Sequence, residues 1–192
     1  MSMTRRTLLA FLVLAGMPAM AAAQATAAGD KLVFIVRHAE KASATDPDPS
    51  LSEAGKARAA ALAGALGDAR VSAIIVTPRK RTTETAANVA SATLVTPIVV
   101  PFGASTPEHV ASVATAVRSS VASAVLVVGH SNTVPAIIAA LGGPRMPDLC
   151  DAAYANLYIV RLPAKGAPTL VRAQFGAPDH AEAASCPGMT VR

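Results

Sequence analysis

The sequence predicts an α/β protein with a mostly parallel, doubly wound sheet. After Asp30, short apolar runs rich in β-branched residues alternate with longer segments of helical periodicity, the pattern of successive strand–helix units. Residues 32–36 and 124–128 are apolar at every position, which is typical of strands buried on both faces of a parallel sheet. Aromatic residues make up only 3% of the chain, so the core is expected to consist mainly of Val, Leu, Ile and Ala.

The elements follow one another in what we expect to be a single domain over residues 30–192, a length sufficient for a sizeable core. In chain order they are predicted as strand 31–36, helix 52–66, strand 71–76, helix 78–90, strand 93–100, helix 107–118, strand 124–128, helix 133–141 and strands 157–162 and 169–174. Ser52 and Thr106 are suitable N-caps for the first and third helices. Pro78 is expected in the first turn of the second helix, where proline is tolerated.

Residues 1–25 predict a secretory signal peptide. Arg5 and Arg6 precede a continuous apolar run over residues 8–15, and small residues suited to cleavage follow at positions 21–25. The arginine pair also resembles a twin-arginine export signal. An uncleaved membrane anchor is the alternative, but the apolar run is shorter than the roughly 20 residues that a membrane span requires. We therefore expect a periplasmic or secreted protein with no stable membrane insertion once the leader is removed.

The net charge limits the classes of binding partner, and the cysteines bear on whether an exported chain is cross-linked. Loss of two basic residues with the leader would reduce the net charge from +5 to +3, which is too small to indicate a nucleic-acid partner. Cys150 and Cys186 are the only cysteines, and in an exported protein we expect them to form a disulfide. Two buried free thiols are the alternative.

Two of the apolar strands each lead directly into a histidine. His38 follows Arg37 at the end of the first strand, and His130 follows Gly129 at the end of the fourth. Ligands of open α/β sheets bind beyond the carboxyl ends of the strands. Both histidines are therefore candidates for one site, although a hydrogen-bonded core histidine is the alternative for His130.

Four motifs resemble the histidine phosphatase (phosphoglycerate mutase-like) superfamily, in particular its small single-domain members. They are Arg37-His-Ala-Glu-Lys41, Leu51-Ser-Glu-Ala-Gly55, Thr77-Pro-Arg-Lys-Arg81-Thr-Thr-Glu-Thr85 and Gly129-His-Ser-Asn-Thr133. They occur in the order of that family within residues 31–141, each at a strand end or a helix start. The resemblance implies a three-layer αβα sandwich in which one strand can run antiparallel.

The resemblance further implies a phosphomonoesterase acting on a small phosphorylated substrate through a phosphohistidine intermediate on His38. Arg37 and Arg81 would clamp the phosphate, because a guanidinium group binds two phosphate oxygens at once, and His130 would donate from the other side. These cationic and N–H groups would supply the charge that a metal supplies elsewhere, so no cofactor is expected. Additional candidates for substrate binding are Lys41, Ser131 and Asn132, the last two of which could instead cap the fourth helix. Surface positions are expected for Arg79, Lys80, His109 and His180.

The general acid, which must protonate the leaving oxygen, is left with several candidates. The family usually places an acidic residue after the third strand, and Glu108 is the only one between Glu84 and Asp148. A glutamate in a first helical turn also has a structural explanation, because the helix dipole favours it there. Asp46 and Asp48 are the alternatives. Glu40 is expected to orient the site or to pair with Lys41 or Arg81.

Two other classes of function compete with the phosphatase. One is a zinc site formed by His38, Glu40 and His130, with His109 as a further candidate ligand, although the neighbouring arginines would repel a cation. The other is a module that binds phosphorylated ligands but has lost turnover.

Overall fold

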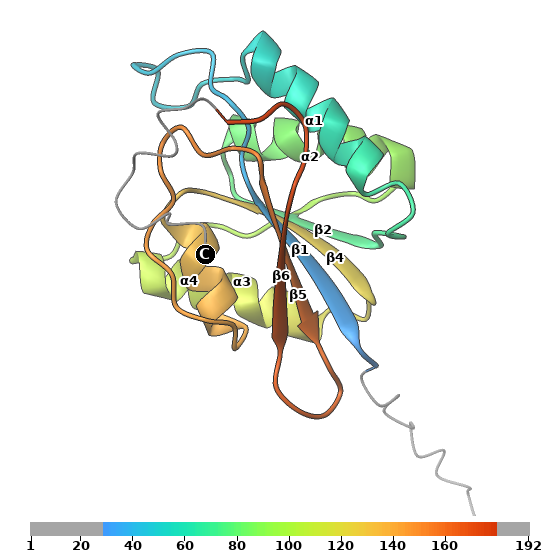
Figure 1. Ribbon diagram of the computed structural model, residues 1–192. Helices are drawn as coiled ribbons and strands as arrows, with labels where there is room; N and C mark the ends of the chain where they lie inside the picture. The colour runs from blue at the N-terminus through green and yellow to red at the C-terminus, as the bar shows by residue number, and fades with distance from the viewer. Residues whose placement is uncertain (1–28, 180–192) are drawn as a thin grey trace, which may run out of the picture.

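The computed structural model describes residues 29–179 (Figure 1). The predicted signal peptide, His180 and Cys186 lie outside these residues. The elements are β1 (Lys31–Arg37), α1 (Glu53–Ala65), β2 (Ala73–Val76), α2 (Lys80–Thr93), β3 (Ile98–Val99), α3 (Thr106–Ser119), β4 (Ala124–Gly129), α4 (Thr133–Ala140), β5 (Asn156–Leu162) and β6 (Thr169–Gln174). None of the helices within residues 29–179 is both long and apolar enough to cross a membrane.

The strands form one six-stranded sheet in the order β3-β2-β4-β1-β5-β6. The pairs β2–β3, β2–β4 and β1–β4 are parallel, whereas β5 is antiparallel to both β1 and β6. Five strands therefore run in one direction and β5 runs in the other. The predicted mostly parallel sheet with one antiparallel strand is confirmed.

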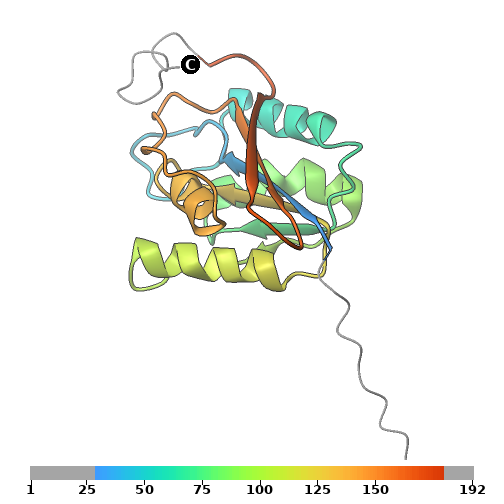
Figure 2. The same cartoon turned by 60° about the horizontal axis from the view of Figure 1, so that its bottom comes forward.

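Helices cover both faces of the sheet, so the molecule has the predicted three layers. Helices α1 and α2 pack together on one face, and α3 and α4 pack together on the other (Figures 1 and 2). Side chains of β1 alternate between the two: Val33 and Ile35 join the core under α3 and α4, and Phe34 and Val36 join the core under α1 and α2. This burial on both faces explains why the strand sequences are continuously apolar.

Several predicted element ends differ from those in the structure. Helix α2 continues to Thr93 and ends at Leu94, whose φ of 57° is left-handed, so only Ile98–Val99 remains as a strand where residues 93–100 were predicted. Pro78 lies before α2 rather than in its first turn. Helix α3 is capped by Ser105, whose hydroxyl accepts a hydrogen bond from the Glu108 amide, and not by Thr106.

Candidate functional site

The pairing of β1 with β4 brings the two strand-end histidines together. Arg37 lies opposite Gly129 in the parallel register, and the His38 amide donates to the Gly129 carbonyl over 2.9 Å. The rings of His38 and His130 have centroids 5.3 Å apart and planes inclined by 63°. A Cβ atom on Gly129 would lie 2.9 Å from Thr133 Oγ1, so the close turn before α4 requires glycine there.

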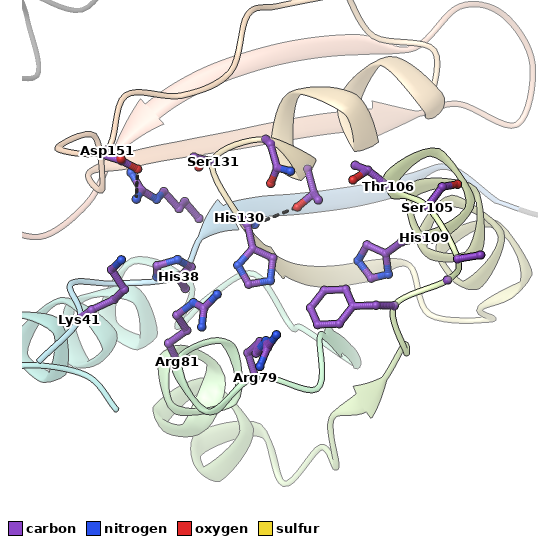
Figure 3. Close-up of a pocket in the computed structure, with 16 residues that line it drawn as sticks. His38, Lys41, Arg79, Arg81, Ser105, Thr106, His109, His130, Ser131 and Asp151 are labelled. Carbon is purple, nitrogen blue, oxygen red and sulfur yellow. Dashed lines mark hydrogen bonds and ion pairs between the residues drawn. The ribbon is translucent and has the colours of Figure 1, made fainter. Parts of the chain in front are cut away.

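A cavity of about 610 Å³ opens at the carboxyl ends of these strands (Figure 3). Seven of the predicted site residues line it, namely Arg37, His38, Lys41, Arg81, His130, Ser131 and Asn132. Glu108 is not among its lining residues. The lining residues come from the end of β1 and the loop after it, the start of α2, the loop before α3 and the start of that helix, the turn between β4 and α4, the start of α4, and the loop before β5.

The His38 imidazole is held as a neutral ring with one free nitrogen. The side chain is 4% exposed, and its Nδ1 lies 2.9 Å from the Ala39 carbonyl, which can only accept a hydrogen bond. Nδ1 therefore carries the proton, and Nε2 keeps its lone pair. Burial, followed by the positive charges of Arg37, Arg81 and Lys41, lowers the pKa of His38 to about 4. The ring is consequently uncharged at neutral pH.

His130 is fixed through a threonine of the α2 motif. Its Nε2 lies 3.0 Å from Thr77 Oγ1, which in turn lies 3.0 Å from Thr82 Oγ1. Burial is the main reason that the pKa of His130 is lowered to about 3, and His38 and Arg81 lower it further. A third threonine, Thr85, accepts the Ala39 amide on its hydroxyl over 2.9 Å. These threonines thus connect the start of α2 to His130 and to the segment that follows His38.

The two predicted phosphate clamps line the cavity, Arg37 as a buried side chain and Arg81 as a partly exposed one. Arg37 donates to the Cys150 carbonyl and to Asp151 Oδ1, and it stacks 4.3 Å above the ring centroid of Tyr154. Arg81 forms an ion pair with Asp48, with 3.6 Å between its Nη1 and Asp48 Oδ1. The Nε atoms of both arginines are buried and have no hydrogen-bond partner within residues 29–179. Both arginines line the same cavity as His38.

Asp151 and Tyr154 orient Arg37 but were not predicted, because they lie in the loop before β5, which contains no recognisable motif. Asp48, a candidate acid, instead pairs with Arg81 and accepts the Lys80 amide. Asp46 is exposed and accepts the amide of Asp48 within the same loop.

Three predictions about individual side chains were wrong. Arg79, the N-cap of α2, lines the cavity, with its guanidinium 5.5 Å from the Phe102 ring centroid. Glu40 pairs with neither Lys41 nor Arg81 but with buried Arg58, in three hydrogen bonds of 2.7–3.0 Å.

The third correction concerns His109, which is buried and lines the cavity instead of lying on the surface. Its Nδ1 lies 3.0 Å from the Pro101 carbonyl, and its ring packs on Phe102. The sequence contained a signal for this position, because His109 precedes Val113 and Val117 by one and two helical turns on the buried face of α3.

The remaining candidates have simple surroundings. Glu108 accepts the Ala104 amide over 2.8 Å and is exposed. Asn132 is the N-cap of α4 but makes no side-chain capping hydrogen bond. Cys150 is buried, and its predicted pairing with Cys186 stays a prediction because Cys186 lies outside the described residues. Within residues 29–179 no three His, Cys, Asp or Glu side chains form a group that could hold a metal ion.

Comparison with known proteins agrees with this geometry. The model of the histidine phosphatase superfamily (branch 1) matches residues 33–101. No curated protein matches the chain. Among solved structures, the protein histidine phosphatase SixA complexed with tungstate is 21% identical, covers 74% of this chain and 96% of its own, and has a TM-score of 0.58.

Two further solved structures show the same fold. A mycobacterial glucosyl-3-phosphoglycerate phosphatase is 15% identical, with coverage of 78% of this chain and 100% of its own and a TM-score of 0.58. A putative phosphohistidine phosphatase SixA from Agrobacterium tumefaciens is 23% identical, with coverage of 77% and 99% and a TM-score of 0.55.

Proposed function

We propose that this protein, whose residues 33–101 match the model of the histidine phosphatase superfamily, hydrolyses a small phosphorylated substrate through a phosphohistidine on His38. The observation that carries the proposal is the state of the His38 ring. Its Nδ1 proton is held by a backbone carbonyl, its pKa is lowered to about 4, and its free Nε2 lies among guanidinium groups. A neutral imidazole of this kind is a nucleophile across the whole neutral pH range.

The surrounding charge suits phosphoryl transfer. In the transition state, negative charge spreads over the three equatorial oxygens of the transferring group. Arg37 and Arg81 would bind these oxygens through fixed N–H groups, and His130 would approach them from the side of β4. Because the cavity already contains these cations, we propose that the reaction requires no metal ion. We also propose, from the N-terminal sequence, that it takes place outside the cytoplasm.

The test is hydrolysis of p-nitrophenyl phosphate by the purified protein, with and without EDTA, beside His38→Asn and Lys80→Ala. Asparagine keeps an N–H group that can donate to the Ala39 carbonyl but has no nucleophilic ring nitrogen. Lys80 is an exposed cation between Arg79 and Arg81 that does not line the cavity. We expect H38N to reduce hydrolysis to background, K80A to retain it and EDTA to leave it unchanged.

A covalent intermediate gives an independent measurement. Rapid quenching of the protein with radiolabelled substrate should trap an acid-labile phosphoenzyme in the wild type and none in H38N. Activity that disappears with EDTA would contradict metal independence. Phosphate binding without hydrolysis would instead indicate a module that has lost turnover.

A further inference from the structure

A third imidazole, that of His109, lines the cavity and has no part in the chemistry described so far. The side chain is 2% exposed, and its Nδ1–H donates to the Pro101 carbonyl over 3.0 Å. Its other ring nitrogen, Nε2, is buried and has no hydrogen-bond partner among residues 29–179. Burial of an unsatisfied polar atom destabilises a fold, so such an atom calls for an explanation, and a catalytic role is one of them.

His109 lies in the part of the cavity that a leaving group would occupy. From His38 the cavity extends past His130 to His109 (Figure 3). The Phe102 ring connects the last two, with centroids 5.9 Å from His130 and 5.1 Å from His109. In-line attack by His38 places the leaving oxygen on the side of phosphorus away from that nucleophile. This is the direction in which the cavity continues toward His109.

No carboxylate among the described residues is well placed to protonate the leaving group. Among the described residues that line the cavity, the one carboxylate is Asp151, which pairs with Arg37. Glu108 does not line the cavity, because its carboxylate turns back to accept the Ala104 amide. His109 is the next residue on α3 and lies on the buried face of that helix with Val113 and Val117.

We propose that His109 is the general acid and general base of the phosphatase reaction, acting through Nε2; this inference rests on the function proposed above. In the first step His38 Nε2 forms a bond to phosphorus, the ester P–O bond breaks, and the leaving oxygen takes the proton from His109 Nε2. In the second step a water molecule gives a proton to the same nitrogen. The water oxygen bonds to phosphorus, and the bond between phosphorus and His38 breaks.

The surroundings of His109 fit both steps. The Pro101 carbonyl accepts the Nδ1–H whether or not Nε2 is protonated, so the ring keeps its position throughout. After the leaving group departs as an alcohol, the neutral ring can accept a proton from water.

The experiment compares two substrates of similar shape, phenyl phosphate and p-nitrophenyl phosphate, with wild type, His109→Asn and Glu108→Gln. Phenolate is strongly basic and needs a proton to leave, whereas p-nitrophenolate leaves without one. Asparagine keeps an amide N–H for the Pro101 carbonyl but cannot transfer a proton. We expect H109N to lower the rate of phosphoenzyme formation from phenyl phosphate by about 10²–10⁴-fold, the usual effect of removing a general acid, and to change the same rate for p-nitrophenyl phosphate much less.

Circular dichroism and thermal melting establish that the variants are folded. Should H109N not fold, the wild type itself is the test: with a working general acid, phosphoenzyme formation depends only weakly on the basicity of the leaving phenolate across a series of aryl phosphates. A steep dependence overturns the inference. Three results of H109N or E108Q would also overturn it: equal losses in the rate of phosphoenzyme formation from both substrates, no loss in that rate, or a leaving-group effect that appears in E108Q instead. Absence of hydrolysis and of phosphoenzyme in the wild type would overturn the proposed function itself.

Discussion

At the scale of single residues, the site depends on histidines that are kept uncharged. A partly solvated histidine would be protonated for much of the time below its ordinary pKa of about 6.5. In this cavity burial and the nearby cations lower the pKa of His38 to about 4 and that of His130 to about 3. The arginines that would bind the phosphate therefore also keep the nucleophile neutral.

This arrangement predicts the direction in which stability changes with pH. The pKa of His38 is lower in the folded protein than the ordinary value of 6.5, so the unfolded chain binds more protons between pH 6.5 and about 4. We expect the free energy of unfolding to be constant above about pH 6.5. Below that value it should fall toward pH 4, with each such histidine contributing a slope of up to about 1.4 kcal/mol per pH unit.

Urea unfolding at several pH values measures this slope, and H38N should make it shallower. An NMR titration of the His38 ring gives the pKa directly. A midpoint near 6.5 would contradict the environment described for this residue.

Not every charged residue near the site acts on substrate. Glu40 immediately follows the His38-Ala39 turn, but its carboxylate binds Arg58, which also donates to the carbonyls of Phe175 and Ala177. The pair is largely buried and joins β1, α1 and the segment after β6. Its position in the motif therefore has a structural explanation.

At the scale of elements, close packing of α1 against the loop after His38 requires a glycine. A Cβ atom on Gly55 would lie 2.3 Å from the Glu40 carbonyl oxygen, which is backbone and cannot move independently. Gly64, in the same helix, has nothing within 4 Å of the equivalent position. The two glycines therefore make a matched pair.

We expect Gly55→Ala to destabilise the protein and to reduce phosphatase activity, because the clash would displace the loop that carries His38. Gly64→Ala should instead stabilise it by up to about 1 kcal/mol, since alanine is the better helix former. Chemical denaturation gives the free energy of unfolding of both variants, and a hydrolysis assay gives their phosphatase activity. A G55A protein as stable and active as the wild type would show that α1 does not constrain the loop.

At the scale of the whole molecule, the site is assembled from segments far apart in the sequence. The arginines and histidines that line the cavity come from β1, the N-terminal end of α2, α3 and the end of β4. In a folded chain these cations are held together, and in an unfolded chain they are separated. An anion that binds the cavity should therefore stabilise the fold as a whole.

Inorganic phosphate is the simplest such anion. At a concentration about 100-fold above its dissociation constant it should stabilise the protein by about 2.7 kcal/mol and raise Tm by about 5–10 °C. Arg81→Gln should lose most of this shift, and Lys80→Gln should keep it, because Lys80 lies outside the cavity. Chloride at equal ionic strength is the control. A shift that persists in R81Q would place phosphate binding elsewhere.

The sequence by itself determined the parallel sheet, the order of most elements and the core of the site. Continuous apolar strands and their terminal residues are local features, and parallel strands necessarily place their carboxyl ends at one edge. Arg37, His38 and His130 could therefore be predicted to meet, and the motif that resembles the histidine phosphatase family added Arg81. The family resemblance added the role of each.

Only the tertiary structure decided which charges pair and which face the cavity. Glu40 binds Arg58 and Asp151 binds Arg37 because α1 and the loop before β5 pack where they do, and no local pattern encodes those distances. His109 and Glu108 are neighbours in sequence. The orientation of α3 nevertheless makes His109 a buried lining residue of the cavity and leaves Glu108 exposed, bound to the Ala104 amide. Such contacts depend on how separate elements pack, which the periodicity of any one segment does not specify.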